Sequence, residues 1–262
     1  MDIVIACKGT PLVENIKYAE KNNTGIEVKA FTSPVIFHSD WHGLLDVVKK
    51  QLQNFTGTRT IHGMFHMGPI NWNRMTHNQL KEDYNKCLSV AEEIQASIMV
   101  LHSTYFPGLT SWKYKDWLNQ QVDLWGGLAE NAIKKDITLV LENIVDEKPD
   151  SLLDVIKEVN SQALKICLDF GHLNLISTEL TELQWIEACA DYLVYTHMHN
   201  NNGRYDSHSC LESGTLNYKE IFTALYGLKE MPKVAVEVDT LDGVTRSLQV
   251  IDQIKKEAIT TV

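Results

Sequence analysis

Eight short runs of apolar, largely β-branched residues recur along the chain, and longer segments with helical spacing separate them. The runs span residues 2–7, 25–30, 60–65, 97–103, 138–143, 163–170, 192–199 and 233–238. Such runs are typical of parallel strands that are buried on both faces. Eight of them alternating with helices predict one α/β (β/α)8 barrel, which we expect to occupy residues 1–262 as a single domain. A doubly wound sheet is the alternative, but the KGTPLVEN segment after the first run lacks a glycine-rich phosphate-binding turn.

The composition indicates an ordinary globular protein, and the net charge of −10 disfavours nucleic acid or an anionic membrane as a partner. The five cysteines are scattered and odd in number, which argues against a disulfide framework and for a reducing compartment. The N-terminal stretch MDIVIACKGTP lacks the basic region of a signal peptide, and no apolar run approaches the length of about 18 residues that a transmembrane helix needs. We therefore expect a cytoplasmic protein.

Acidic and imidazole side chains stand where six successive runs end, from the third to the eighth. They are His62, His102, Glu142, Asp169, His172, His197, His199, Asp206, His208 and Glu237. The carboxyl ends of the strands of a (β/α)8 barrel meet at one face, where active sites lie. A single histidine in a loop is ordinarily solvated, but a carboxylate placed directly after several apolar residues is costly to bury without a partner. The shared position therefore predicts a metal site, and mixed histidine and carboxylate ligands suit Zn, Mn, Co or Mg.

Alternation along a strand places His197 and His199 on the same side of the seventh run. We expect His199 to be the ligand, because it lies nearer the carboxyl end, and His197 to orient a ligand from behind. Glu142 and Glu237 would face one another across the barrel mouth, where such a pair can take a proton from one face of a carbon and return it to the other. Glu27 ends the second run and fits either a substrate contact or a structural role.

Some features lie outside the strand ends. Residues 31–57 form a longer connection than a barrel requires and could be a lid over the mouth. We expect His38, His42 and His77 to be surface residues, whereas His66 could line the mouth.

The strand-end motifs together resemble those of the xylose-isomerase-like TIM-barrel superfamily, which includes sugar-phosphate isomerases and epimerases, ketose 3-epimerases and endonuclease IV. The motifs that carry the resemblance are IHGMF, VLHSTYFPG, LVLENIVDEKP, ICLDFGHLNL, HMHNNNGRYDSH and AVEVD, in that order. They run through nearly the whole chain. The resemblance implies a TIM barrel and metal-dependent chemistry on a small molecule, and barrels of this superfamily often form homo-oligomers.

The ketose 3-epimerases hold one divalent cation with two Glu, one Asp and one His. Residue by residue, that set falls on Glu142, Asp169, His199 and Glu237. The resemblance implies that the two glutamates are also the acid/base pair and that His172 binds substrate. Arg204 is an approximate counterpart of the family's basic substrate-binding residue, one position out of register. His197 and Glu27 are further candidates for substrate binding.

Endonuclease IV holds three zinc ions with nine ligands, and all nine positions carry a suitable residue type here. They are His62, His102, Glu142, Asp169, His172, His199, Asp206, His208 and Glu237. The surrounding text departs from the endonuclease: LDFGHLNL lacks its DTCH context, and ESGTLNY lacks its GEG turn.

The preferred hypothesis is therefore a metal-dependent isomerase or epimerase of a small sugar, sugar phosphate or polyol, in which the cation stabilises an enediolate. An uncharged or weakly charged substrate is expected, because only Arg74 and Arg204 are obvious cations for a phosphate. The alternatives are a multinuclear zinc phosphodiesterase and a carbohydrate-binding or metal-binding module without turnover.

Overall fold

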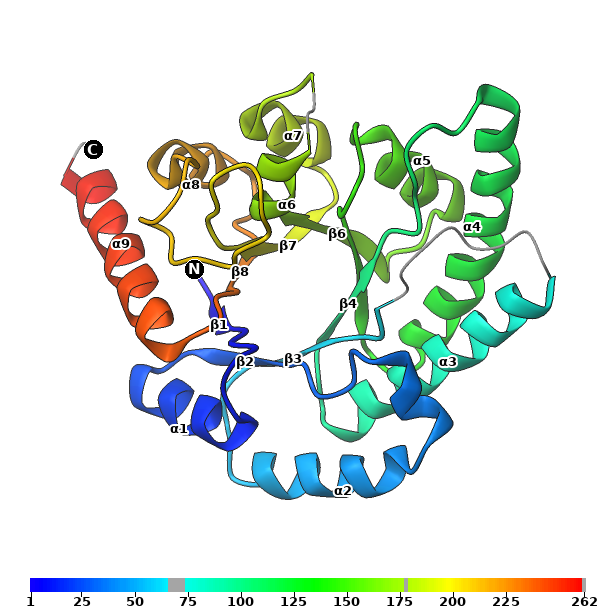
Figure 1. Ribbon diagram of the computed structural model, residues 1–262, viewed down its shortest axis with the longest axis horizontal. Helices are drawn as coiled ribbons and strands as arrows, with labels where there is room; N and C mark the ends of the chain where they lie inside the picture. The colour runs from blue at the N-terminus through cyan, green and yellow to red at the C-terminus, as the bar shows by residue number, and fades with distance from the viewer. Residues whose placement is uncertain (66–73, 177–178, 261–262) are drawn as a thin grey trace.

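Eight parallel strands close into one barrel in the order in which they occur along the chain, with β1 pairing both β2 and β8. The computed structural model describes residues 1–65, 74–176 and 179–260. The strands are β1 Ile3–Ile5, β2 Gly25–Val28, β3 Arg59–His62, β4 Ile98–His102, β5 Thr138–Glu142, β6 Leu164–Asp169, β7 Leu193–Met198 and β8 Lys233–Val236. Figure 1 shows them as a central ring with the helices outside it. The prediction of a (β/α)8 barrel is confirmed.

The helices of the described residues surround the barrel and shield its outer surface. They are α1 Leu12–Asn22, α2 Trp41–Leu52, α3 Arg74–Glu93, α4 Ser111–Ile133, α5 Asp150–Val159, α6 Phe170–Leu175, α7 Glu182–Cys189, α8 Tyr218–Tyr226 and α9 Leu241–Thr260, with the 3₁₀ helix η1 Pro34–His38 after β2. Their apolar faces and the outward side chains of the strands form the larger core, to which Trp125, Trp185 and Phe222 contribute fully buried rings. Within this described part, every helix is too short or too polar to span a bilayer.

A smaller apolar cluster fills the inside of the barrel. It consists of Val4, Ile98, Val100, Val140, Cys167, Tyr195 and Ala235. Because side chains alternate along a strand, the residue two positions further on faces the same way. Val100 is thus followed on the inner side by His102, and Val140 by Glu142. The same step leads from Cys167, Tyr195 and Ala235 to Asp169, His197 and Glu237. The apolar plug therefore ends directly below a polar layer at the carboxyl ends of the strands.

Two expectations for the connections are corrected by the structure. Residues 41–52 form α2, a peripheral barrel helix that buries Leu45, Val48 and Leu52, so the lid hypothesis for residues 31–57 is wrong for this part. The expectation of a surface position is also wrong for His77, which is buried with Nε2 2.8 Å from Asp123 Oδ2. His38 and His42 are exposed, as expected. His66 lies outside the described residues.

Candidate metal centre

The strand register places the acidic and imidazole residues beside one another at the barrel mouth. His102 on β4 is paired with Glu142 on β5, and Asp169 on β6 is paired with His197 on β7. His62, Glu142, Asp169, His197, His199 and Glu237 are each at most 5% exposed. The barrel thus brings together residues that are 175 positions apart in the chain, from 62 to 237, in a layer that water hardly reaches.

Three carboxylates and one imidazole form the group nearest the barrel axis. His197 Nδ1 lies 2.8 Å from Glu142 Oε1, 2.8 Å from Glu237 Oε2 and 3.8 Å from Asp169 Oδ2. These four side chains can offer ligand atoms that all lie within 4.8 Å of one another. A single cation could therefore contact several of them at once.

Two further groups flank this one. His62 Nε2 is 3.1 Å and His102 Nε2 is 3.6 Å from Glu142 Oε2, so Glu142 belongs to two groups. The third group is composed of His172, His199, Asp206 and His208. His199 connects it to the first, because its Nε2 lies 3.1 Å from Asp169 Oδ1 and 3.7 Å from Asp206 Oδ1.

The three groups thus bring together at the mouth all nine residues that correspond to the zinc ligands of endonuclease IV. The assignment of His199 rather than His197 to a cation shared with Glu142, Asp169 and Glu237 stays a prediction, because both imidazoles approach Asp169.

The backbone orients three of the histidines toward the mouth. His62, His172 and His208 each have Nδ1 3.0 to 3.1 Å from a main-chain carbonyl, to which an Nδ1–H can donate. The carbonyls belong to Gly63, Asn143 and Glu237. Such a bond fixes the orientation of the ring, so that Nε2 would offer its lone pair to a cation once it has given up its proton. The Nε2 atom of each ring points to a carboxylate, at 3.1 Å from Glu142, 3.5 Å from Asp206 and 3.1 Å from Asp206 respectively. This arrangement is typical of metal-binding histidines.

The carboxylates and the imidazoles shift the pKa of one another. Burial alone would raise the pKa of Glu142 and Glu237, but the charge of His197 outweighs burial and holds both pKa values well below the ordinary range. Burial would lower the pKa of His197, yet Glu237 and Glu142 hold it well above 6.5. His102 is different, because burial dominates and lowers its pKa to about 3, so this imidazole is neutral at physiological pH.

Several buried ligand atoms have no hydrogen-bond partner among the described residues. They include Asp169 Oδ2 and both ring nitrogens of His199, whose Nε2 lies near Asp169 Oδ1 without hydrogen-bond geometry. A buried polar atom left unpaired costs about 1–3 kcal/mol. A divalent cation would satisfy these atoms, and its donor set of imidazole nitrogens and carboxylate oxygens suits Zn, Mn or Co. The residues present therefore fit the metal that the resemblance implies.

Gly171 is required by the position of His199. A Cβ atom at residue 171 would lie 1.9 Å from Cε1 and 2.3 Å from Nε2 of the His199 ring. The imidazole thus packs directly on the main chain of α6, in the turn that also presents Asp169 and His172. Any side chain at residue 171 would have to displace the ring.

Lys29 is a residue at the mouth that the sequence reasoning missed. It follows β2, and its Nζ forms an ion pair with Glu237 and lies 3.7 Å from Glu27 Oε1. Burial would lower the pKa of Lys29, but the two carboxylates outweigh burial and raise it, so the ammonium stays charged. The signal was present in the sequence, since Lys29 is two positions after Glu27 and shares its side of the strand. A search restricted to metal-binding side chains passes over it.

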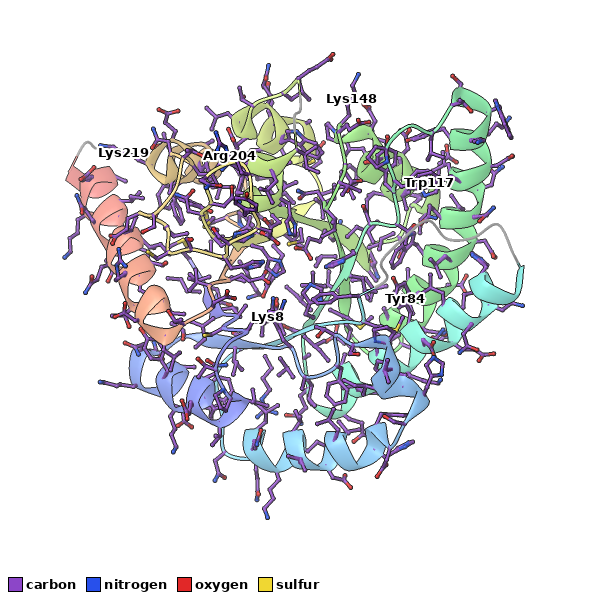
Figure 2. The ribbon with its side chains drawn as sticks, viewed as in Figure 1. Lys8, Tyr84, Trp117, Lys148, Arg204 and Lys219 are labelled. Atoms are coloured by element: carbon purple, nitrogen blue, oxygen red, sulfur yellow. The ribbon has the colours of Figure 1, made fainter. Side chains whose placement is uncertain are left out.

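Glu27 and Arg204, two of the candidates for substrate binding, differ in their surroundings. Glu27 is buried below the carboxylate group, where Oε2 accepts a hydrogen bond from Tyr195 and lies 3.0 Å from His197 Nε2. Arg204 lies in the exposed loop after β7, and Figure 2 shows it farther from the barrel axis than Lys8. Its role in substrate binding stays a prediction. The side chain of Arg74 lies outside the described part of the structure.

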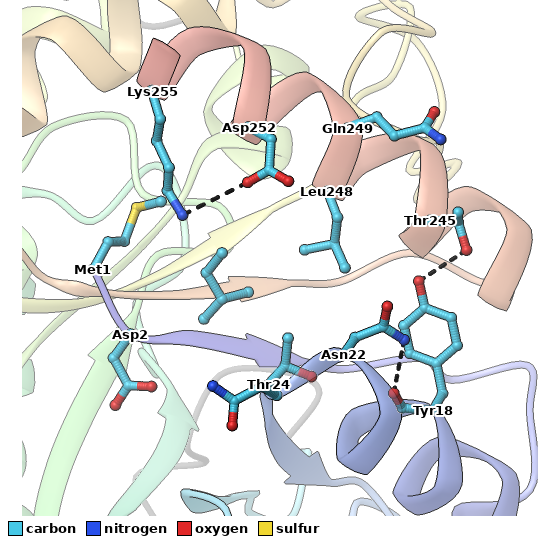
Figure 3. Close-up of a pocket in the computed structure, with 12 residues that line it drawn as sticks. Met1, Asp2, Tyr18, Asn22, Thr24, Thr245, Leu248, Gln249, Asp252 and Lys255 are labelled. Carbon is cyan, nitrogen blue, oxygen red and sulfur yellow. Dashed lines mark hydrogen bonds and ion pairs between the residues drawn. The ribbon is translucent and has the colours of Figure 1, made fainter. Parts of the chain in front are cut away.

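A large cavity lies at the other end of the barrel. It has a volume of about 740 Å³ and is lined by residues of α1, α9 and the start of β1. Figure 3 shows Tyr18 and Thr245 bridging the two helices beside it, with their hydroxyls 2.8 Å apart. The residues that line it include no histidine. The chemistry of the mouth is therefore separate from this cavity.

Comparison with known families gives a match over most of the chain. The family described as "Xylose isomerase-like TIM barrel" matches residues 17–254. Two uncharacterized proteins of Methanocaldococcus jannaschii are related in sequence. MJ1311 is 22% identical over 193 residues, which are 71% of this chain and 66% of that protein. MJ1614 is 24% identical over 157 residues, which are 59% of this chain and 60% of that protein. The chain thus spans about two thirds or less of their lengths.

Solved structures with the same fold include sugar epimerases. A D-tagatose 3-epimerase-like protein superposes with a TM-score of 0.83 at 19% identity, covering 100% of this chain and 99% of that one. The TTHB071 protein from Thermus thermophilus, soaked with ZnCl2, gives 0.80 at 20% identity and coverage of 98% and 99%. A D-allulose 3-epimerase from Methylomonas sp. gives 0.76 at 17% identity and coverage of 97% and 98%. At these identities the likeness shows the fold.

Proposed function

The chain belongs to the xylose isomerase-like TIM-barrel family, and from this membership we propose that it is a metal-dependent isomerase or epimerase of a sugar or polyol. The similar structures of a D-allulose 3-epimerase and a D-tagatose 3-epimerase-like protein support this reaction class. The substrate is a small carbohydrate-like molecule. A cytoplasmic location and a homo-oligomeric state remain predictions.

One observation carries the proposal: the carboxylates of Glu142, at the end of β5, and Glu237, after β8, converge on a single atom, His197 Nδ1, at 2.8 Å each. Two ionised carboxylates this close repel one another unless a positive charge lies between them. In the structure His197 supplies part of that charge. A divalent cation would be held by Glu142, Asp169, Glu237 and His199 or His197, and it would act as a Lewis acid toward negative charge on the substrate oxygens.

Glu142 and Glu237 are the groups proposed to move protons. Both are ionised at neutral pH because of their depressed pKa values, so either can accept a proton from carbon. They reach the mouth from β5 and from the residue after β8, which allows them to approach a bound sugar from different sides. His172, with Nδ1 3.0 Å from the Asn143 carbonyl, presents Nε2 for a contact with a substrate hydroxyl or with a second cation.

The test is solvent-deuterium exchange into common ketoses and keto-polyols as candidate substrates. The protein is supplied with Mn²⁺, Co²⁺ or Mg²⁺, and the exchange is followed by proton NMR. We expect exchange at the carbon next to the carbonyl, and we expect Glu142→Gln and Glu237→Gln to slow it by roughly 10²–10⁴-fold. Glu130→Gln, on the exposed side of α4, is the matched control and should exchange at the wild-type rate. Full exchange in Glu237→Gln would exclude this residue from proton transfer.

A second candidate function is a multinuclear zinc hydrolase, and the two flanking groups of ligands favour it. The number of metal ions bound per chain distinguishes the two candidate functions. One cation per chain supports the isomerase or epimerase, whereas two or three zinc ions per chain support the hydrolase. His62→Ala and His208→Ala test the flanking groups directly, because unchanged metal content and unchanged activity in both variants would exclude the multinuclear site.

A further inference from the structure

Four buried polar side chains form a chain of contacts inside the barrel that ends at the candidate metal centre. Thr60 Oγ1, on β3, lies 2.9 Å from the hydroxyl of Tyr195 on β7, and Figure 1 shows β7 across the ring from β2 and β3. The Tyr195 hydroxyl donates a hydrogen bond of 2.9 Å to Glu27 Oε2, and the same oxygen lies 3.0 Å from His197 Nε2. Thr60, Tyr195 and His197 are 0% exposed and Glu27 is 4% exposed, so these contacts form out of reach of bulk water. We call the four residues the Glu27 chain.

The fold itself does not require a carboxylate at residue 27. The side chains that fill the inside of the barrel below the metal centre are largely apolar, and they include Val4, Val100 and Ala235. Burying a carboxylate is costly, and replacing a buried group of paired charges by apolar side chains of similar volume is often neutral or stabilising. The presence of Glu27 is therefore better explained by its effect on the polar layer above it.

The Glu27 chain holds one edge of the His197 imidazole, and the other edge faces the carboxylates of the metal centre. Nε2 faces Glu27, whereas Nδ1 lies 2.8 Å from Glu142 Oε1 and 2.8 Å from Glu237 Oε2. A carboxylate at one ring nitrogen fixes the orientation of the ring and the direction of the other nitrogen. The Tyr195 ring packs edge-on to the imidazole, with the ring centres 5.6 Å apart. Tyr195 thus holds the imidazole with its ring and Glu27 with its hydroxyl.

The position of His197 affects the spacing of the carboxylates that meet at its Nδ1. The ligand atoms that Glu142, Asp169, His197 and Glu237 can offer all lie within 4.8 Å of one another. Two ligand atoms that are each about 2.0–2.6 Å from one cation are at most about 4–5 Å apart. The observed spacing is thus close to the widest that one cation can span. If the imidazole turned away, Glu142 and Glu237 would lose their shared partner and could move apart.

Glu27 acts on the metal centre through a neighbour. It belongs to none of the three ligand groups that the described residues form. Its Oε2 is engaged by His197 and Tyr195, and its Oε1 lies 3.7 Å from Lys29 Nζ. The contact with His197 therefore connects Glu27 to the carboxylates of the centre.

We propose that Glu27 is a positioning residue of the metal centre: it orients His197, and His197 sets the spacing of Glu142 and Glu237 for one divalent cation. Tyr195 and Thr60 hold the carboxylate of Glu27 in place. This inference rests on the proposed function, because the two carboxylates are the proposed cation ligands and proton carriers. It selects the structural role for Glu27 over the substrate contact, the two alternatives that the sequence leaves open.

The test measures Mn²⁺ binding to the full chain by isothermal titration calorimetry in two variants that remove the same charge. Glu27→Leu removes the acceptor for His197 and should weaken Mn²⁺ binding by about 10–100-fold, as the loss of a group that orients a metal ligand does. Glu27→Gln keeps an oxygen that can accept hydrogen bonds from both Tyr195 and His197, so it should weaken binding less than about tenfold. Glu20→Gln, on the exposed side of α1, is the matched control and should bind Mn²⁺ like the wild type.

Tyr195→Phe keeps the aromatic ring and removes only the hydroxyl that holds Glu27. It should weaken Mn²⁺ binding roughly tenfold, at the lower end of the same range. This variant tests the inference even if Glu27→Leu does not fold, and calorimetric melting without the cation shows which variants are folded.

The difference between Glu27→Leu and Glu27→Gln decides the inference. Equal losses in the two variants would mean that Glu27 acts through its charge, and wild-type affinity in folded Glu27→Leu or Tyr195→Phe would mean that it positions nothing. Either result overturns the positioning role. Solvent-deuterium exchange into sugars separates this inference from the proposed function. The expected order of Mn²⁺ affinities without exchange in the wild type would overturn the isomerase function alone, whereas exchange in the wild type with unchanged affinity in Glu27→Leu would overturn the positioning role alone.

Discussion

Gly171→Ala tests the position of His199 with a single added methyl group. The new Cβ would lie 1.9 Å from His199 Cε1, whereas carbon atoms in contact stay about 3.5–4.0 Å apart. The ring would have to move by more than 1 Å, which is too far for an imidazole that must stay about 2.0–2.1 Å from a zinc ion. We expect the loss of this ligand to weaken cation binding about 100-fold, at the upper end of the range for perturbed metal sites.

The loss of cation affinity in Gly171→Ala can be measured as a smaller rise in Tm when the cation is added. Unfolding entropy of about 2.1 cal/mol/K per residue gives about 0.55 kcal/mol/K for 262 residues. A cation at 100 times its Kd stabilises the folded protein by ~2.7 kcal/mol, which raises the wild-type Tm by about 5 °C. With affinity reduced 100-fold, the same concentration contributes only ~0.4 kcal/mol and less than about 1 °C.

Differential scanning calorimetry with and without the cation measures this shift. Gly127→Ala is the matched control, because a Cβ there meets nothing within 4 Å in the exposed middle of α4. It should gain about 0.5–1 kcal/mol of stability and keep the full cation-induced shift. A full shift in Gly171→Ala would refute the reasoning, since His199 would then be either displaceable without consequence or not a ligand.

Three further predictions concern pH, charge and helix capping. In metal-free protein, the neighbouring carboxylates outweigh burial and raise the pKa of His172 from 6.5 to about 10. The contribution of His172 to stability is therefore complete below pH 6.5 and is lost as the pH rises toward 10. Urea titrations across this pH window should show a falling free energy of unfolding, and a flat profile would contradict the ion pairs of His172. Lys29→Met should destabilise the metal-free protein by up to about 3–5 kcal/mol, because it leaves the buried carboxylate of Glu237 without its ion pair. The same substitution should tighten divalent cation binding at least tenfold, because the ammonium and the cation compete for Glu237. Weaker cation binding in calorimetry would refute this competition. Thr181→Ala removes the capping box that Thr181 forms with Gln184 at the start of α7 and should cost about 1 kcal/mol in urea unfolding, while cation binding stays unchanged.

The alternation of apolar runs and helical segments was sufficient to predict the barrel, because parallel strands covered on both sides have few other arrangements. The same alternation explains why residues at the strand ends could be assigned to the mouth. Glu142, Asp169 and Glu237 each stand two positions after a residue of the inner apolar plug, so a period of two determines the side on which they lie. The directions of these side chains therefore follow from strand geometry alone.

Other features depend on contacts between distant loops and could not be read from local pattern. Residues 31–57 look like an insertion in the sequence, but Leu45, Val48 and Leu52 reveal α2 once the barrel supplies a surface to cover. His77 looks exposed until its partner Asp123 is brought close by α4. Lys29 was overlooked because its meaning depends on Glu237, more than 200 residues later.

The most direct test of the central claim is a crystal structure of the protein soaked with Mn²⁺ and measured at a wavelength where manganese scatters anomalously. The proposed site predicts an anomalous peak at the barrel mouth, within about 2.0–2.6 Å of carboxylate oxygens of Glu142, Asp169 and Glu237. A peak bonded to none of these three residues, or an empty mouth at saturating Mn²⁺, would contradict the claim that the strand ends form one metal centre.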